Sequence, residues 1–206
     1  LIHTMLSDGG LPSHLAGNMG TTLISLAGSS RQKDIYVTEL SSFQLEHIHA
    51  FKADRAVFLN VSPDHLDWHK TIDHYIAAKY RLITGLNETG IAVLNRDDPI
   101  VRAAGRHTLA RVIAFSRTGK PRPGCYLEEG WIILDSNTRQ RIMPVSDIQL
   151  RGPHNQENVM ASILIGETFG LTAAQMSSTV RKFQGLEHRL EKVDTFSGVS
   201  FYNDSK

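Results

Sequence analysis

The chain has 206 residues, of which 41% are hydrophobic and 21% are charged, as in an ordinary globular protein. Its 22 Lys and Arg residues nearly balance 21 Asp and Glu residues, which leaves a net charge of +1. That balance gives no electrostatic basis for binding nucleic acid or an anionic membrane, so we expect neither as a partner. No apolar run approaches the roughly 20 residues of a membrane-spanning helix.

Cys125 is the only cysteine, which excludes an internal disulfide and fits a reducing compartment. We expect it to be a buried structural thiol rather than a nucleophile. Residues 1–6 lack an initiator Met and the charged start of a signal peptide, and they are typical of the middle of a helix. Residues 201–206 pass from a strand into a polar loop. We therefore expect the chain to be part of a longer protein.

Strands and helices alternate along the first half of the sequence. Residues 34–40 (DIYVTEL) and 53–61 (ADRAVFLNV) are short, β-rich and mostly apolar, as buried parallel strands are. Apolar residues recur at helical spacing over residues 71–85, which predicts a helix. Residues 90–95 and 110–115 predict two more strands, and Asp97-Asp98-Pro99 is typical of the start of a helix between them.

Turn residues mark a change of character over residues 119–147, where short segments near 131–134 and 141–145 predict antiparallel hairpins. Two helices are expected over residues 155–169 and 172–183, and then a hairpin over residues 190–202 that turns at Ser197-Gly198. The alternation predicts an α/β fold with a mostly parallel sheet, flanking helices and a small antiparallel section. In such sheets ligands bind beyond the carboxyl ends of the strands.

Polar residues follow both of the first two predicted strands. Glu39 ends the first strand, where a carboxylate is costly to bury unless it is paired or bound to a cation such as Mg²⁺. A solvated strand-end carboxylate is an equally good interpretation. Residues 60–69 (NVSPDHLDWH) hold two carboxylates and two imidazoles, which leaves metal binding, phosphate contact and simple solubility open. His65 by itself is more typical of a surface residue.

Lys79 lies on the apolar face of the helix predicted over residues 71–85, beside Ala77 and Ala78. An amine held near apolar surface can react as a nucleophile, for example toward CO₂, although a lysine that reaches past the apolar surface to solvent is the simpler interpretation. Asn155 and Asn158 are three residues apart and share one face of a helical turn. Their amides can present both a donor and an acceptor to a base such as adenine, whereas Asn155 alone could be a helix cap.

Seven strings occur together in one order: GNMG at 17–20, ELSSFQL at 39–45, NV and DHLD at 60–67, AAK at 77–79, GPHN and a later Asn at 152–158, GLEHR at 185–189, and NDSK at 203–206. In this combination the chain resembles the Mur ligases, the ATP-dependent amide ligases of bacterial cell-wall synthesis. The ELSSFQL string is most similar to that of the member that adds D-glutamate.

The resemblance implies a role for each matching position. Glu39 and His65 would be ligands or close neighbours of Mg²⁺, and Lys79 would be carbamylated by CO₂ so that it helps to hold a metal. Asn18 would lie near the nucleotide-sugar substrate and the reacting phosphate. Nucleotide contacts are implied for five further residues. Asn155 and Asn158 would contact adenine, Arg189 the phosphates and Asp204 the ribose, while Lys206 would have no defined role.

The family mechanism is phosphorylation of a substrate carboxylate by ATP, followed by attack of an amine on the acyl phosphate. The implied substrates are UDP-N-acetylmuramoyl-L-alanine, D-glutamate and ATP, and the implied setting is the bacterial cytoplasm, in peptidoglycan precursor synthesis, with a monomeric full-length protein. Residues 1–185 would be most of the central ATP- and Mg²⁺-binding domain, of the P-loop type. Residues 186–206 would begin the C-terminal domain.

The sequence departs from the family in what it does not contain. It has no G-x-x-x-x-G-K-[ST] phosphate loop, which should lie shortly before Leu1. The N-terminal domain and most of the C-terminal domain are expected to lie outside the chain, so we expect that the 206 residues alone do not turn over. The alternatives are another Mur or folylpolyglutamate-type ligase, a non-catalytic nucleotide-binding remnant, and a metallohydrolase built on His47, His49, Asp64, His65 and His69.

Overall fold

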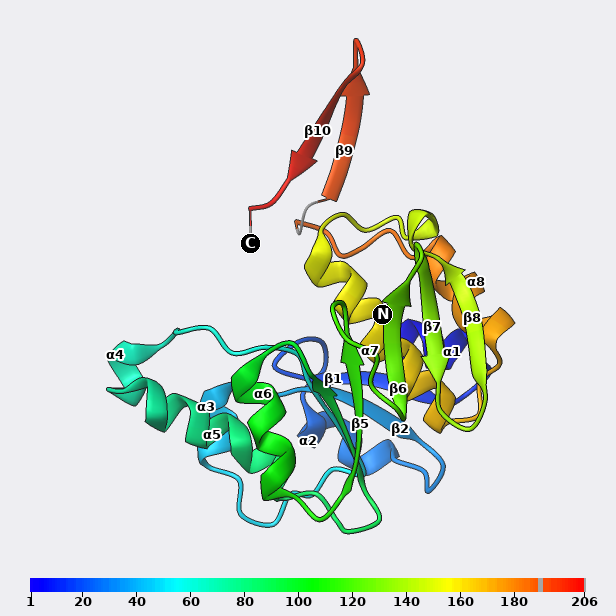
Figure 1. Cartoon of the computed structure of the whole chain (residues 1–206). Helices are drawn as coiled ribbons and strands as arrows, with labels where there is room; N and C mark the ends of the chain where they lie inside the picture. Colours follow the sequence, from blue (N-terminus) through cyan, green and yellow to red (C-terminus); the bar gives the residue numbers. More distant parts are fainter. Residues whose placement is uncertain (189–190, 206) are drawn as a thin grey trace.

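Six strands form the main sheet of the chain, in the order β3–β4–β5–β6–β7–β8 (Figure 1). The computed structural model describes residues 1–188 and 191–205. The first four strands pair in parallel and the last two pair antiparallel. In chain order the six strands are β3 (Arg55–Phe58), β4 (Ile91–Asn95), β5 (Arg111–Ser116), β6 (Gly124–Glu128), β7 (Trp131–Asp135) and β8 (Arg139–Pro144).

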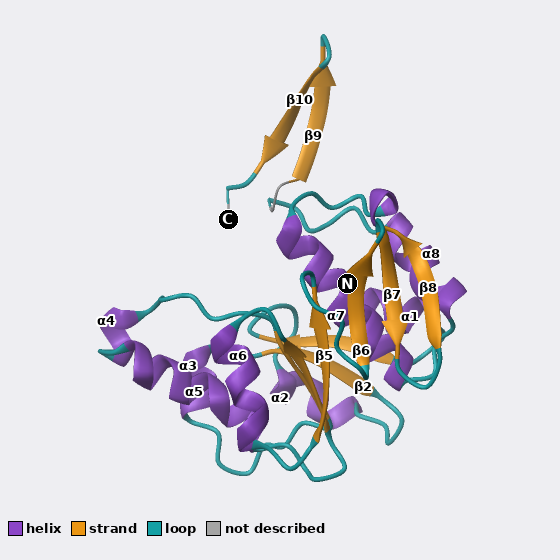
Figure 2. Ribbon diagram, in the orientation of Figure 1, coloured by secondary structure: helices purple, strands orange, loops and turns teal. Residues whose placement is uncertain are grey.

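Helices cover both faces of this sheet (Figure 2). Along β4, Val93 packs into one apolar core while Ala92 and Leu94 pack into the other, because successive side chains of a strand point to opposite faces. On the Val93 side lie α1 (Ile2–Asp8), α7 (Pro153–Thr168) and α8 (Ala173–Lys182). On the opposite side lie α5 (Ile72–Thr84), α6 (Pro99–Ala104) and the 3₁₀ turn η2 (Gly105–His107).

A second, two-stranded parallel sheet precedes the main one along the chain. Its strands are β1 (Ser13–Gly17) and β2 (Ile35–Glu39), joined through α2 (Leu23–Leu26) and η1 (Ala27–Ser29). The short helices α3 (Ser42–Glu46) and α4 (Leu66–His69) follow β2 and β3, and η3 (Val145–Asp147) follows β8.

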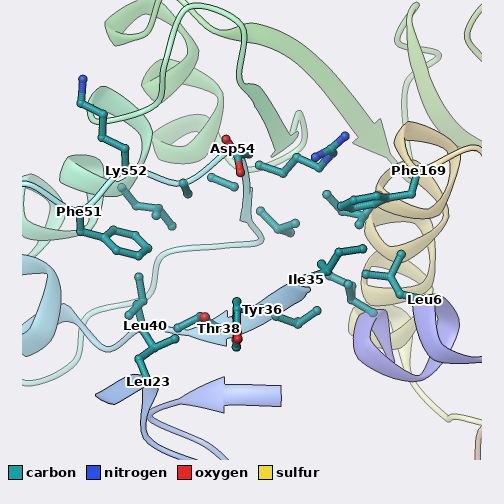
Figure 3. A pocket seen from close by; sticks show the side chains of 18 of the residues that line it. Leu6, Leu23, Ile35, Tyr36, Thr38, Leu40, Phe51, Lys52, Asp54 and Phe169 are labelled. Carbon is teal, nitrogen blue, oxygen red and sulfur yellow. The ribbon is translucent and has the colours of Figure 1, made fainter. Parts of the chain in front are cut away.

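A cavity of about 440 Å³ lies between the two sheets, with β2 on one wall and β3 on the other (Figure 3). Among the described residues, β2 pairs with β1 alone and β3 pairs with β4 alone. Leu6, Ile165 and Phe169 line the cavity from the helices on the Val93 side of the main sheet. In the part of the chain that the structure describes, β2 and β3 therefore each have one edge without a strand partner.

The last two strands form a hairpin that projects from the rest of the molecule (Figure 1). β9 (Glu191–Phe196) and β10 (Val199–Asn203) pair antiparallel on either side of the predicted Ser197-Gly198 turn. The guanidinium of Arg151 lies 4.8 Å from the ring centroid of Tyr202, and Asn203 Nδ2 lies 2.8 Å from His188 Nδ1. These contacts join the hairpin to the segments on either side of α7 and α8.

The predicted α/β fold is confirmed, including the parallel strands, the helices after residue 70 and the final hairpin. Cys125 is fully buried, and that burial raises the pKa of its thiol, as expected for a structural cysteine. The antiparallel section is not a separate attachment: β6 pairs in parallel with β5 and antiparallel with β7, so both sections share one sheet. Within the described residues, no helix has the length and apolar character needed to cross a membrane.

Candidate active site

Asn18 and Glu39 lie together at the carboxyl ends of β1 and β2. Gly17 and Glu39 are opposite each other in the parallel register, and the backbone N–H of Asn18 donates to the Glu39 carbonyl at 2.8 Å. The side-chain amide of Asn18 donates to the exposed Glu39 carboxylate at 3.0 Å. Gly17 has φ +101°, and a Cβ there would lie 2.3 Å from the Glu39 carbonyl oxygen. Only glycine permits this close approach, so it positions the pair.

The chain turns into α3 directly after Glu39. Ser41 caps α3 in a capping box, because its hydroxyl accepts from the Gln44 N–H while the Gln44 side chain accepts from the Ser41 N–H. Ser42 is then buried at the first position of the helix, and Phe43 follows it. The Phe43 ring contacts the imidazole of His65, with 4.9 Å between the ring centroids. The carboxylate end of β2 is thereby linked to the segment after β3.

His65 is the N-cap residue of α4 and has a left-handed backbone, φ +53°, which non-glycine residues adopt rarely. Its N–H donates to the Asp64 carboxylate at 2.8 Å, and its Nε2 lies 3.5 Å from the other oxygen of that group. Its ring centroid also lies 6.4 Å from that of Tyr75. Backbone strain held at a polar side chain is more common at functional sites than elsewhere.

Lys79 contacts the same tyrosine as His65. It lies one turn after Tyr75 on α5, and its Nζ is 5.0 Å from the Tyr75 ring centroid. Lys79 is half-buried and Tyr75 is buried. The structure therefore joins Asn18 with Glu39 by a hydrogen bond, and it places His65 and Lys79 against the same tyrosine. Sequence reasoning assigned no role at the site to Phe43, which contacts His65, or to Tyr75, which contacts both His65 and Lys79.

The predicted adenine residues lie in the first turn of α7, next to Gly152 and Pro153. Asn158 Nδ2 donates to Asn155 Oδ1 at 3.1 Å, and Asn155 Nδ2 donates to the Arg151 carbonyl at 2.7 Å. Both side chains are half-buried. They share one helical face, as predicted, and use part of their hydrogen-bonding capacity on each other. Asn155 is not the helix cap, because Gly152 occupies the N-cap position.

A carboxylate at the end of β4 organises the neighbouring loop. Asp97 accepts hydrogen bonds from the Ser116 hydroxyl at 2.5 Å, the Thr118 hydroxyl at 2.7 Å and the Arg117 N–H at 2.6 Å. Arg117 Nε in turn donates to Gln156 on α7 at 3.2 Å. Burial works to raise the pKa of Asp97, but these hydrogen bonds outweigh it and hold that pKa below its usual value. Sequence reasoning identified Asp97 only as part of a helix start.

The remaining predicted contacts belong to the end of the chain. Asp204 is exposed just after β10. Arg189 and Lys206 lie outside the described residues. No geometry is therefore assigned to these two predicted nucleotide contacts.

The donor atoms at this site suit a cation that is also held by a nucleotide. Residues 1–188 and 191–205 hold no group of three or more His, Cys, Asp and Glu side chains placed to bind a metal. The structure thus gives the metallohydrolase alternative no support, because that chemistry needs a nearly complete protein cage. The exposed Glu39 carboxylate fits Mg²⁺, a hard cation that prefers oxygen ligands and usually retains waters and phosphate oxygens, whereas the His65 imidazole is a softer donor.

Comparison with known proteins decides the family. Residues 2–166 match the Mur ligase middle domain. The chain belongs to the Mur ligase family. It is 37% identical over its whole length to a UDP-N-acetylmuramoylalanine–D-glutamate ligase of Thermoanaerobacter sp. (strain X514), and 40% identical over 93% of its length to the ligase of the same name from Acidobacterium capsulatum. These alignments cover 46% and 42% of the relatives, so the chain spans less than half of their length.

Solved Mur ligases have the same fold. A UDP-N-acetylmuramoyl-L-alanyl-D-glutamate–2,6-diaminopimelate ligase superposes with a TM-score of 0.72 at 22% identity, over 95% of this chain and 45% of that one. MurF ligase from Thermotoga maritima, in complex with ADP, superposes with a TM-score of 0.69 at 20% identity, over 98% of this chain and 49% of that one. At these identities the likeness concerns the fold alone.

Proposed function

We propose that the protein containing this chain is the Mur ligase that adds D-glutamate to UDP-N-acetylmuramoyl-L-alanine. ATP would phosphorylate the substrate carboxylate, the D-glutamate amine would attack the resulting acyl phosphate, and phosphate would leave. The names of its relatives support this choice of substrate. The observation that carries the proposal is the placement of four residues. Asn18 and Glu39 share a hydrogen bond at the end of β2, the chain runs from there into Phe43, which contacts His65, and Tyr75 contacts both His65 and Lys79.

In this proposal Glu39, His65 and a carbamylated Lys79 hold Mg²⁺ beside the reacting phosphate. The cation, when bound, neutralises charge on the phosphoryl oxygens. Asn18 donates a hydrogen bond to the Glu39 carboxylate at 3.0 Å and lies at the same end of the β1–β2 sheet, where it can also orient the substrate carboxylate. Carbamylation would turn the Lys79 side chain from a cation that faces the Tyr75 ring into an anion that can reach a metal.

The nucleotide would lie against the start of α7. Asn155 and Asn158 would exchange their mutual hydrogen bond for the donor and acceptor edges of adenine. Arg189 would contact phosphates and Asp204 the ribose, and Lys206 would belong to the same site without a defined contact. Residues 1–185 would form the central domain and residues 186–206 the start of the next.

The phosphate loop would come from outside these 206 residues. The cavity between β2 and β3 supports this part of the proposal, because a strand leading into such a loop would pair with the open edges of both. We therefore propose that the 206 residues do not turn over alone. In its full length the protein would act as a monomer in the cytoplasm. Phosphate release from the isolated chain that depends on ATP, Mg²⁺ and D-glutamate would contradict this.

Lys79 provides the test of the proposed reaction. The full-length product of the gene is assayed for D-glutamate ligation with added bicarbonate, as wild type and as Lys79→Ala and Lys79→Arg. Both variants should lose activity, and only the wild type should carry a labile adduct of the mass of CO₂. Lys33→Ala, an exposed lysine just before β2, is the matched control and should keep full activity. Full activity in Lys79→Ala would refute the proposed role.

A test of amino-acid preference separates the alternatives. The same preparation is offered D-glutamate, L-lysine, diaminopimelate and folate with glutamate. Preference for D-glutamate supports the proposal, and preference for another acceptor favours a different Mur or folylpolyglutamate-type ligase. ATP binding without phosphate release from any of them would indicate a non-catalytic nucleotide-binding protein.

A further inference from the structure

His69 is a buried imidazole that the proposed mechanism does not use. Its side chain is 1% exposed at the end of α4. Nε2 lies 2.9 Å from the hydroxyl of Ser42, which is itself 3% exposed at the start of α3. Nδ1 has no hydrogen-bond partner in the part of the chain that the structure describes, and the nearest anion is the Glu46 carboxylate at 3.9 Å. A buried nitrogen left in this way needs a physical reason.

The charge of Glu46 selects the tautomer of His69. A hydrogen bond from Trp68 Nε1 at 2.9 Å is the main cause that lowers the pKa of Glu46, so this group is a carboxylate at neutral pH. A lone pair on Nδ1 would be repelled by that carboxylate, whereas an Nδ1–H would be attracted to it. Nε2 then accepts from the Ser42 hydroxyl. The order is carboxylate, imidazole, hydroxyl, with a hydrogen bond at Nε2 and only a charge attraction at Nδ1.

Burial excludes a nucleophilic role for this hydroxyl. Serine hydrolases use the same order of groups, but their nucleophile must reach a substrate. Ser42 is covered, and the imidazole lies against the Phe43 ring, with centroids 5.6 Å apart and planes 18° apart. Tyr75 covers it from α5, with centroids 5.4 Å apart. The three groups therefore hold two segments together.

The two segments are the ones that carry the proposed metal ligands. Ser42 follows Glu39 by three residues and His69 follows His65 by four, so their hydrogen bond joins the two segments that follow these residues. Phe43 lies between the two imidazoles and contacts each. We propose that His69 is a positioning residue whose bond to Ser42 sets the separation of Glu39 and His65. This inference rests on the proposed function, because that function makes those two residues metal ligands.

The test separates the hydrogen bond from the packing of the ring. His69→Phe keeps an aromatic ring between Phe43 and Tyr75 but loses the bond to Ser42. His69→Gln loses the ring but keeps a polar group that can reach the same hydroxyl. Ser42→Ala removes the hydroxyl alone and is the smallest change. His49→Gln, an exposed histidine after α3, is the control.

The readout is the dissociation constant of Mn²⁺, measured by electron paramagnetic resonance on the full-length protein with ADP. Residues that orient metal ligands typically contribute about 10- to 100-fold in metal affinity. We expect Ser42→Ala and His69→Phe to weaken Mn²⁺ binding about 10-fold each, and the double variant to be no weaker than either, because both remove one interaction. His69→Gln should retain most of the affinity.

A Glu39→Ala arm distinguishes failure of the inference from failure of the proposed function. If Glu39→Ala loses Mn²⁺ binding while Ser42→Ala and His69→Phe bind like the wild type, the positioning role is wrong and the metal site stands. If Glu39→Ala itself binds like the wild type, the metal site is wrong and the inference fails with it. If His69→Phe lowers the melting temperature with no change in Mn²⁺ affinity, His69 has only a structural role. An unchanged Mn²⁺ affinity of folded Ser42→Ala protein would support that conclusion.

Discussion

The strands β2 and β4 differ in burial although their sequences carry the same signal. Both are short, β-rich runs with few polar residues. In β4, Ala92, Val93 and Leu94 are at most 2% exposed, because strands flank it on both sides and helices cover both faces. In β2, residues 35–38 are all only half-buried, and its free edge faces the cavity. The lower burial of β2 is therefore due to the elements around it and not to its own sequence.

Matched valine truncations should show the largest difference between the two strands. Val93→Ala removes two methyl groups from a fully buried site, and we expect it to lower the free energy of unfolding by about 2–3 kcal/mol. Val37→Ala makes the same change in half-buried β2 and should cost about 1 kcal/mol or less. Urea unfolding followed by circular dichroism measures both values.

The full-length protein sharpens this comparison. If another strand fills the cavity there, the cost of Val37→Ala should rise toward that of Val93→Ala. Equal costs of the two truncations in the 206-residue chain would contradict the comparison, because β2 would then already be as well packed as β4.

The Asp97 cluster should have the next largest effect, since it ties β5 to the end of β4. Asp97→Asn places an amide where three donors converge, and we expect it to lower the free energy of unfolding by about 2 kcal/mol. Because the folded pKa of Asp97 is lowered, its stabilisation is present above the unfolded value of about 4 and is lost as pH falls through the folded pKa. The variant should therefore lack that part of the acid-induced loss of stability.

Unfolding curves at neutral pH and at about pH 3 check this prediction, with the exposed Glu88→Gln as control. If the difference in the free energy of unfolding between wild type and Asp97→Asn is the same at both pH values, the charge of Asp97 contributes nothing to stability. No counterpart of this cluster ties β2 to a strand beyond the cavity within the described residues.

Composition and periodicity predicted most of the main sheet, because its strands and helices are long enough to carry a clear pattern. The same signals missed β1, α3 and α4. β1 (SHLAG) has no alternation, and the two helices are too short to show helical periodicity. The motifs named Asn18, Glu39, His65 and Lys79. The structure pairs Asn18 with Glu39 and places His65 and Lys79 against Tyr75. The contacts of Phe43, His69 and Tyr75 depend on how α3 packs on α5, about 30 residues away, and no local pattern encodes that.

The two walls of the cavity also differ in how they are anchored. Arg55 begins β3, and its guanidinium donates to the Thr168 hydroxyl at 2.8 Å and the Thr168 carbonyl at 3.2 Å while it lies 3.8 Å from the Phe169 ring centroid. Arg55→Lys keeps the charge but loses the two hydrogen bonds of the guanidinium to Thr168 and its stacking on the Phe169 ring. We expect it to lower the free energy of unfolding by about 1 kcal/mol. Chemical denaturation measures it, with the exposed Arg106→Lys as control. No loss relative to that control would mean that the β3 wall needs no anchor.

Two capping boxes give the smallest and most local test. Thr172 and Gln175 cap α8 against the main core, and Ser41 and Gln44 cap α3 beside the site. Thr172→Ala should lower the global free energy of unfolding by about 0.5–1 kcal/mol, because α8 unfolds with the core. Ser41→Ala removes an equivalent bond from a five-residue helix next to the half-buried strand. It should mainly speed amide hydrogen exchange in α3, since regions with fewer buried contacts open locally before the whole chain unfolds.

Exchange followed by NMR, together with urea unfolding, separates these two results. In one outcome, amide exchange in α3 of Ser41→Ala stays slow and the variant loses as much global free energy of unfolding as Thr172→Ala. The site region would then unfold as one unit with the main sheet. Fast local exchange with little global loss would mean that the β1–β2 region forms a less stable unit. In the full-length protein, a neighbour for β2 should then slow exchange in α3 even in Ser41→Ala, because the helix starts three residues after the end of the strand.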